Sequence, residues 1–378
     1  MVNVSEPGTD PAAAAGRPPD GSVDHFDALL TDLPASSPWR RGTRIALVML
    51  LVLVTLLAIV AAGGVFAVHR LERSYDRNIE RFGDPFRAIP PQERPPAVKT
   101  AALNVLLLGS DSRISAGDPS MWVEGAQRTD AIMILHIPAD RSAAYVVSIP
   151  RDSYVPIPGH GRNKINAAFS FGGPALMVRT VEKLTKVRID HMVIVDFEGF
   201  KKITDTLGGV EITVPRATSD ERATFRAGTY RMDGATALNY VRQRHNLPGG
   251  DFDRERRQQN WIRSVTHEAM RGGTLTHPLK LNDVLTALTR SISTDDDFTI
   301  GEMRDLAISL RGVGPDGLAL FTAPVRGTDM IGGGHGPAMS IVWLDQARDA
   351  VLWKAMARDR MAAWAAGNSG AELGTTVR

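Results

Sequence analysis

The chain of 378 residues contains no cysteine. This absence excludes disulfide bonds, thiolate metal sites and a cysteine nucleophile. A strong charge of either sign is also missing, since 44 Lys and Arg residues face 42 Asp and Glu residues, for a net charge of +2. So small a net charge does not predict a general polyanion-binding surface, and nucleic acid is not expected as a partner.

Three common catalytic signatures are absent as well. The sequence has no G-x-x-x-x-G-K-[ST] loop, no G-x-S-x-G turn and no H-E-x-x-H pair. These patterns mark nucleotide-triphosphate binding, a serine nucleophile and a zinc site, respectively. None of these three chemistries is therefore predicted.

One long segment, Ile45 to Val68, has no charged residue. As a helix it is long enough to cross about 30 Å of hydrocarbon. Arg40, Arg41 and Arg44 directly precede it, which predicts a cytoplasmic N-terminus and an extracytoplasmic remainder. A cleaved signal peptide is the alternative, but the run exceeds the usual signal core of roughly 7 to 15 residues. We therefore expect a single-pass protein of the cell membrane.

Composition and periodicity divide the rest of the chain. We expect a disordered cytoplasmic tail over residues 1–44, the transmembrane helix over 45–68, a stalk and proline-rich linker over 69–99, a catalytic domain over 100–365 and a flexible C-terminus over 366–378. The predicted strands are Leu103–Leu108, Ala131–Ile137, Ala144–Ile149, His191–Asp196, Val210–Val214 and Leu318–Ala323. The predicted helices are Ala175–Leu184, Phe197–Leu207, Arg254–Met270, Asp283–Ser291, Ile300–Leu310 and Leu344–Met356. Strands that alternate with helices predict an α/β fold, a mixed sheet layered between helices.

The segment from Tyr240 to Gln259 concentrates arginine on either side of a turn. Arg242 and Arg244 lie two apart at the end of a strand-like run, Ala237–Gln243, and so would share a face. Arg254 and Gln258 lie four apart on a helical run and would share another. Planar guanidinium groups suit phosphate oxygens, so the segment is interpreted as an anion site. The alternative is a solvated charged helix with an Asp253–Arg257 ion pair.

Two aspartates stand next to predicted strands: Asp111 follows Leu103–Leu108, and Asp130 precedes Ala131–Ile137. If these strands are antiparallel neighbours, both carboxylates lie at one edge of the sheet. Two carboxylates together with substrate phosphates form an ordinary magnesium shell. The alternative is that both aspartates cap turns, as aspartates near Gly, Ser and Thr commonly do.

Two further segments carry basic residues. Arg151 and Asp152 end the strand Ala144–Ile149, where Arg151 could reach the same anion or form a plain salt bridge with its neighbour. The loop from Gly159 to Asn166 carries Arg162 and Lys164 and resembles a phosphate-binding loop in general character only.

Taken in order, these segments resemble the LytR-CpsA-Psr family of cell-envelope phosphotransferases. The matching runs are Asn104–Asp111, Arg128–Leu135, Ser148–Tyr154, Lys164–Gly173, Asp190–Pro215 and Tyr240–Gln259. The chain departs from the family pattern by a long insertion, Ser112–Gln127, which is expected to be a lid or a surface loop.

The resemblance implies a role for each matching residue. Mg²⁺ would be held by Asp111 and Asp130, and the catalytic residues would be Asp111, Arg151, Arg244 and Arg254. Pyrophosphate would be bound by Arg151, Lys164, Arg242, Arg244, Arg254 and Gln258. Arg256 and Arg257 are expected to face solvent or to pair with Asp253, and Asp111 and Asp152 are both candidates for the general base. Lipid would pack against apolar runs such as Phe169–Met177 and His191–Phe200.

The resemblance also implies the activity. A teichoic-acid-, arabinogalactan- or capsule-like glycan would pass from a polyprenyl-pyrophosphate carrier to a sugar hydroxyl of peptidoglycan, leaving a phosphodiester link. Two alternatives remain open: a polyprenyl-pyrophosphate phosphatase or pyrophosphatase with water as acceptor, and a non-catalytic envelope regulator that binds lipid pyrophosphate.

Overall fold

A computed structural model describes residues 79–97, 100–110, 129–243, 246–271, 286, 289, 291–310, 312–314, 317–332 and 338–374. No helix within these ranges has both the length and the apolar character needed to cross a membrane. The predicted transmembrane run Ile45–Val68, the insertion Ser112–Gln127 and most of the predicted helix Asp283–Ser291 lie outside the described residues.

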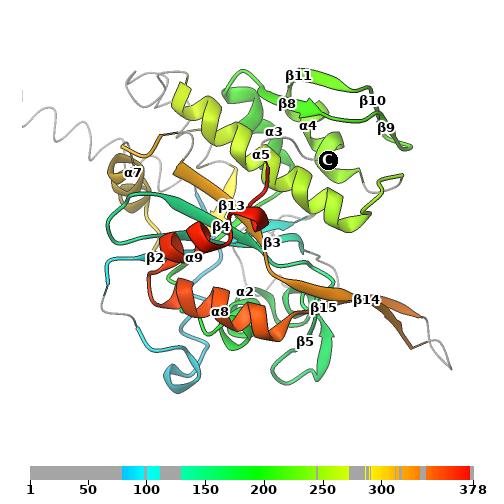
Figure 1. Cartoon of the computed structure of the whole chain (residues 1–378). Helices are drawn as coiled ribbons and strands as arrows, with labels where there is room; N and C mark the ends of the chain where they lie inside the picture. Colours follow the sequence, from blue (N-terminus) through cyan, green and yellow to red (C-terminus); the bar gives the residue numbers. More distant parts are fainter. Residues whose placement is uncertain are drawn as a thin grey trace, which may run out of the picture. The chain divides into compact units, whose positions relative to one another are not determined.

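A seven-stranded mixed sheet forms the centre of the domain (Figure 1). Its strands, in spatial order, are β1 (Glu80–Arg81), β12 (Ile292–Thr294), β7 (His191–Val195), β2 (Leu103–Ser110), β3 (Thr129–Ile137), β4 (Ala144–Ser148) and β13 (Leu318–Thr322). The β2 strand runs parallel to β7 and antiparallel to β3, and β4 runs antiparallel to β3 and parallel to β13. The prediction of a mixed α/β sheet is confirmed.

Helices cover both faces of this sheet because its central strands are apolar on both sides. Leu106 and Leu108 of β2 pack in the core that includes α2 (Ala167–Thr185) and α8 (Gln346–Ala357). Leu107, which points the other way, packs against a cluster of Met133, Val146 and Leu320, as does Ile262 of α5 (Asp251–Arg271). Figure 1 shows α5 on one side of the sheet and α2 with α8 on the other.

A second apolar cluster lies beside α5. It is built from α3 (Phe197–Thr206), α4 (Gly234–Arg242) and the paired strands β8 (Val210–Val214) and β11 (Gly228–Met232). Phe200 stacks on Trp261 with ring centroids 4.0 Å apart, which fixes α3 against α5.

The remaining elements are short. They are η1 (Pro91–Glu93), β5 (Tyr154–Pro156), β6 (Arg162–Lys164), β9 (Thr218–Ser219), β10 (Thr224–Phe225), α7 (Ile300–Ser309), β14 (Val325–Ile331), β15 (Met339–Leu344), α9 (Met361–Gly367) and η5 (Ser369–Ala371).

The structure corrects the predicted start of the folded domain, because residues 79–97 are not a linker. The β1 strand joins the sheet through β12, and Phe82 and Ile89 are buried in the main core. Arg94 forms an ion pair with the buried Glu182 at 2.7 Å. The many prolines of this segment prevent a long helix but do not prevent its apolar side chains from packing.

The predicted strand Ala237–Gln243 is wrong, because these residues belong to α4 and its end. Asp233 caps the helix by accepting a hydrogen bond from the Thr236 backbone N–H at 2.8 Å. Ala237, Tyr240 and Val241 are buried. Their spacing of three and four residues is that of one helix face. This helical spacing was overlooked because Arg242 and Arg244, two residues apart, resemble the alternation of a strand.

The predicted flexible C-terminus, 366–378, is also corrected as far as Gly374. Leu373 donates a backbone hydrogen bond to the Leu320 carbonyl at 2.8 Å, and Glu372 bridges to Phe321. The Arg263 guanidinium donates to the carbonyl oxygens of Leu373 and Gly374. This tail therefore extends the edge of the sheet at β13.

Candidate functional site

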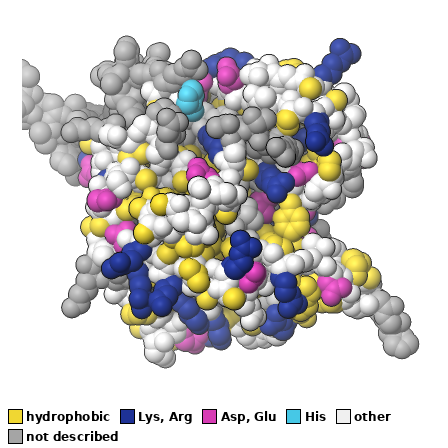
Figure 2. Space-filling view, viewed as in Figure 1, with side chains coloured by type: hydrophobic (Ala, Val, Ile, Leu, Met, Phe, Trp, Pro, Cys, Tyr) yellow, Lys and Arg dark blue, Asp and Glu magenta, His cyan; other side chains and the backbone are white. Residues whose placement is uncertain are grey.

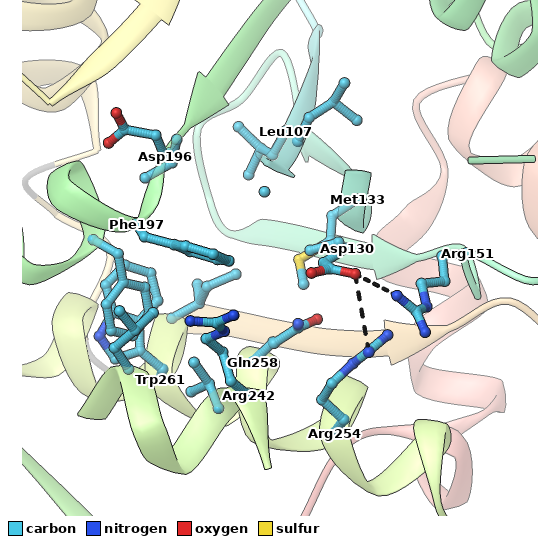
Figure 3. Close-up of a pocket in the computed structure, with 18 of the residues that line it drawn as sticks. Leu107, Asp130, Met133, Arg151, Asp196, Phe197, Arg242, Arg254, Gln258 and Trp261 are labelled. Atoms are coloured by element: carbon cyan, nitrogen blue, oxygen red, sulfur yellow. Dashed lines mark hydrogen bonds and ion pairs between the residues drawn. The ribbon is translucent and has the colours of Figure 1, made fainter. Parts of the chain in front are cut away.

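A cavity of about 340 Å³ lies between the α5-facing side of the sheet and helices α3, α4 and α5 (Figure 3). Its wall is mostly apolar and includes Leu107, Met133, Val195, Phe197, Phe200, Leu238, Val241, Trp261 and Ile262. Figure 3 shows Phe197 and Trp261 toward one end and Arg151 and Arg254 toward the other. Arg242 and Asp196 also line the cavity, near Phe197. A mostly apolar wall that meets charged side chains at the Arg151 and Arg254 end, here called the charged mouth, suits a ligand that has a hydrocarbon part and an anionic head.

Two arginines and two aspartates form the charged mouth. Arg151 is hydrogen-bonded to Asp130, and its Nε lies 3.2 Å from Asp251 Oδ2. Arg254 donates to Asp251 at 2.8 Å and lies 4.0 Å from Asp130. Asp130 thus stands between the two guanidinium groups, as Figure 3 shows.

Arg254 is the more deeply buried of the two arginines, with 6% of its side chain exposed. Burial lowers its pKa, and Asp251 opposes this shift. Burial also opposes the charge of Arg151, but Asp251, Asp130 and Asp152 outweigh it and raise the pKa of Arg151. The Nε of Arg254 has no hydrogen-bond partner among the described residues. A buried charged donor without a partner is costly and indicates a position for an acceptor such as a phosphate oxygen.

Lys164 joins this network indirectly. Its Nζ lies 3.1 Å from Asp152, and Asp152 lies 4.0 Å from the Nε of Arg151. Lys164 is not among the described residues that line the cavity. Arg162, from the same loop, turns away and donates to the Tyr154 carbonyl at 2.8 Å.

Arg242 and Gln258 do line the cavity. Arg242 lies at the end of α4 with its guanidinium over the Phe197 ring, 4.2 Å from the centroid. Arg254 and Gln258 share one face of α5, as their spacing predicts. The structure thus brings together Asp130, Arg151, Arg242, Arg254 and Gln258, while Asp111 and Arg244 lie outside the described residues.

The two arginines set aside as solvent-facing differ from each other. Arg256 pairs with Asp253 at 3.2 Å and is half exposed, which confirms its prediction. Arg257 is buried, so its prediction is wrong. It donates to the Tyr240 carbonyl at 3.2 Å and to Gln243 at 2.6 Å. Because α4 ends against α5, this side of the charged helix faces carbonyl groups instead of water.

The two apolar runs expected to hold lipid also differ. Val195, Phe197 and Phe200, from the run His191–Phe200, line the cavity. The run Phe169–Met177 does not, because Phe169 and Met177 are fully buried in the core on the opposite side of the sheet.

Three polar residues that line the cavity or adjoin Arg254 were not found from the sequence. Arg222 lines the cavity from the turn between β9 and β10, and no spacing pattern marks it. Asp251 could have been found, since it lies one helical turn before Arg254. Glu255 accepts a hydrogen bond from Thr322 at 3.1 Å, and burial raises its pKa to about 7.

The fit of a metal ion can be tested on the carboxylates. No group of three or more His, Cys, Asp or Glu side chains is arranged as a metal site in the part of the chain that the structure describes. Asp130 lines the cavity, and β2 and β3 are antiparallel neighbours, with Ser110 opposite Thr129. Mg²⁺ commonly uses one or two carboxylates together with phosphate oxygens and water. Asp130, which also pairs with Arg151, is a described carboxylate of the cavity that could serve as such a ligand.

Comparison with known proteins agrees with this architecture. The model of the LytR_cpsA_psr family matches residues 80–351, and the chain belongs to this family. The cell wall biosynthesis protein LcpA of Corynebacterium glutamicum is 33% identical over 269 residues, which cover 61% of this chain and 51% of LcpA. The polyisoprenyl-teichoic acid–peptidoglycan teichoic acid transferase TagU of Bacillus cereus is 34% identical over 209 residues, covering 55% of this chain and 64% of TagU.

The fold is shared with a solved structure. TagV of Bacillus subtilis superposes with a TM-score of 0.58 at 24% identity, covering 70% of this chain and 99% of TagV. The alignments with LcpA and TagU span about half to two thirds of those relatives.

Proposed function

We propose that this protein transfers a glycan polymer from a polyprenyl-pyrophosphate carrier to a sugar hydroxyl of peptidoglycan. The observation that carries this proposal is the cavity whose apolar wall ends at Arg151, Arg254 and Asp130. The names of LcpA and TagU, a cell wall biosynthesis protein and a teichoic acid transferase, support it. The protein would be anchored in the cell membrane by Ile45–Val68, with its catalytic domain outside.

The arginines would act by changing partners. Pyrophosphate oxygens would replace part of the carboxylate contacts of Arg151 and Arg254. The Nε of Arg254, which has no partner among the described residues, would gain an acceptor. Gln258 and Arg242 would bind further oxygens, while Phe197, Phe200 and Trp261 would contact the hydrocarbon chain. Phosphoryl transfer depends mainly on such positioning and charge neutralisation.

The reaction proposed is an in-line displacement. The acceptor hydroxyl oxygen forms a bond to the phosphorus that bears the glycan, and the bond from that phosphorus to the bridging oxygen breaks. Polyprenyl phosphate leaves with the electron pair, and the hydroxyl proton passes to a carboxylate, with Asp111 and Asp152 as the two candidates. Mg²⁺, which Asp111 and Asp130 would hold, supplies neutralisation of the phosphate charge.

The direct test uses the full-length protein with a polyprenyl-pyrophosphate-linked glycan, Mg²⁺ and uncrosslinked peptidoglycan. We expect glycan in the peptidoglycan fraction, and we expect Arg254→Ala to abolish it. Arg256→Ala is the matched control, because it removes a half-exposed arginine from the same helix. Release of phosphate without transfer would favour the phosphatase alternative, and tight binding without turnover would favour the regulator.

A further inference from the structure

A second hollow lies on the other side of the domain. This cleft of about 720 Å³ is enclosed by the C-terminal end of α2, by α8, and by strands β5 and β15. It shares no lining residue with the cavity between α3, α4 and α5. The reaction proposed above does not use it.

Two buried side chains of α8 that line this cleft each have a polar atom without a hydrogen-bond partner in the described part of the chain. Asp349 is 6% exposed and Trp353 is 2% exposed. Asp349 Oδ1 and Trp353 Nε1 make no hydrogen bond with any described residue. They lie one helical turn apart, so one acceptor and one donor are presented by the same helix face. Buried polar atoms are normally paired, and this pair therefore indicates a ligand that both donates and accepts hydrogen bonds.

The walls of the cleft add aromatic rings and positive charge. Tyr154 and Trp343 are half-buried and meet edge to face, with ring centroids 5.5 Å apart. Arg162 lies over both rings, 5.0 Å and 5.8 Å from their centroids. The described lining includes one carboxylate, Asp349, and five basic side chains: Arg162, Lys183, Lys186, Lys354 and Arg358. Figure 2 shows Lys and Arg side chains gathered in the lower part of this view of the molecule, where α8 lies.

We propose that this cleft binds the acceptor: a saccharide chain that carries carboxylates, as uncrosslinked peptidoglycan does. Sugar hydroxyls both donate and accept hydrogen bonds, which matches Asp349 and Trp353. The apolar faces of sugar rings match Tyr154 and Trp343. Carboxylates match the basic lining.

The position of the cleft along the chain supports the acceptor over the donor glycan. Tyr154 follows Arg151 by three residues, so their Cα atoms lie within about 11 Å of each other. Ser153, between them, forms a bridge with Val342 of β15, the other wall of the cleft. The apolar cavity extends from the arginines in the direction of Phe197 and Trp261 (Figure 3). In-line transfer needs the attacking oxygen opposite the leaving lipid phosphate. This inference rests on the proposed function.

Equilibrium binding of soluble, uncrosslinked peptidoglycan chains to the full-length protein tests this assignment. We expect Trp343→Ala, Asp349→Asn and Lys354→Ala each to weaken binding about tenfold, as the loss of one good polar or stacking contact does. Arg348→Ala is the matched control for Lys354→Ala, because both residues are exposed on α8 and Arg348 does not line the cleft. Chains of N-acetylglucosamine alone, which lack carboxylates, should bind more weakly and should lose the dependence on Lys354.

The outcomes separate this inference from the proposed function. Arg254→Ala should retain binding of the peptidoglycan chains while it abolishes transfer. Glycan binding that depends on Trp343, in a protein without transfer activity, would overturn the proposed function and leave the cleft assignment in place. Unchanged affinity in Trp343→Ala and Lys354→Ala, both folded by circular dichroism, would overturn the cleft assignment. So would a selective loss of affinity for the lipid-linked donor glycan.

Discussion

Arg254 donates to Asp251 at 2.8 Å but leaves its buried Nε without a partner among the described residues. Asp251 also contacts Arg151 at 3.2 Å, so one carboxylate holds both guanidinium groups at the mouth of the cavity. The site is therefore partly neutralised and positioned before a ligand arrives. Preorganised donors of this kind contribute most where a transition state develops negative charge.

Replacement of Arg254 by lysine tests this preorganisation. Lysine keeps the positive charge but loses the planar fork that serves Asp251 and an additional acceptor. We expect the transfer rate constant of Arg254→Lys to fall about 100-fold, a loss typical for the removal of one aligned donor. Steady-state kinetics of Arg254→Lys beside Arg256→Lys would measure this effect. An equal rate in both variants would show that only the charge at position 254 matters.

The sequence allowed most of the sheet and part of the site to be predicted. Strands such as β2 and β8 were visible because apolar and β-branched runs are bounded by Gly, Pro and Asp. The shared face of Arg254 and Gln258 followed from helical spacing alone. The alternation of Arg242 and Arg244 resembled a strand, so the helix α4 was missed. The position of Arg222 in the cavity wall depends on contacts distant in the sequence and could not be predicted, because no local pattern marks this residue.

Arg257 illustrates the same limit and gives a prediction about stability. Its guanidinium is buried, contacts Tyr240 and Gln243, and also donates to Thr218 at 3.1 Å. Arg257→Ala would remove the buried donor that these three groups share, although Gln243 Oε1 would keep its hydrogen bond from the Thr218 hydroxyl at 2.8 Å. We expect a loss of about 3 kcal/mol in the free energy of unfolding. Arg256→Ala should change it by less than about 0.5 kcal/mol. Urea unfolding of both variants is the measurement, and similar losses would contradict the buried role of Arg257.

The segment before residue 100 gives a second prediction about stability. Arg94 donates to both carboxylate oxygens of Glu182, whose side chain is 1% exposed. Arg94→Ala would leave a buried carboxylate without its counter-ion, at a cost of about 3 to 5 kcal/mol. Arg87→Ala is the control, because the Arg87 side chain is 88% exposed. If thermal unfolding shows the same midpoint for Arg94→Ala and the parent protein, the segment 79–97 does not contribute to the fold.

Two carboxyl groups with raised pKa values predict how stability depends on pH. Burial raises the pKa of Glu255 to about 7, and burial together with Asp345 raises the pKa of Asp349 to about 7. Both groups bind protons more tightly in the folded protein than their ordinary values of 4.5 and 3.8 allow in the unfolded chain. Their stabilising contribution is therefore complete below those ordinary values and is lost as the pH rises through about 7.

We expect the ligand-free protein to unfold at lower urea concentration at pH 8 than at pH 5. The double variant Glu255→Gln, Asp349→Asn removes both titrations and should show a smaller difference between the two pH values. An equal difference in the parent protein and the double variant would assign the pH dependence to other groups.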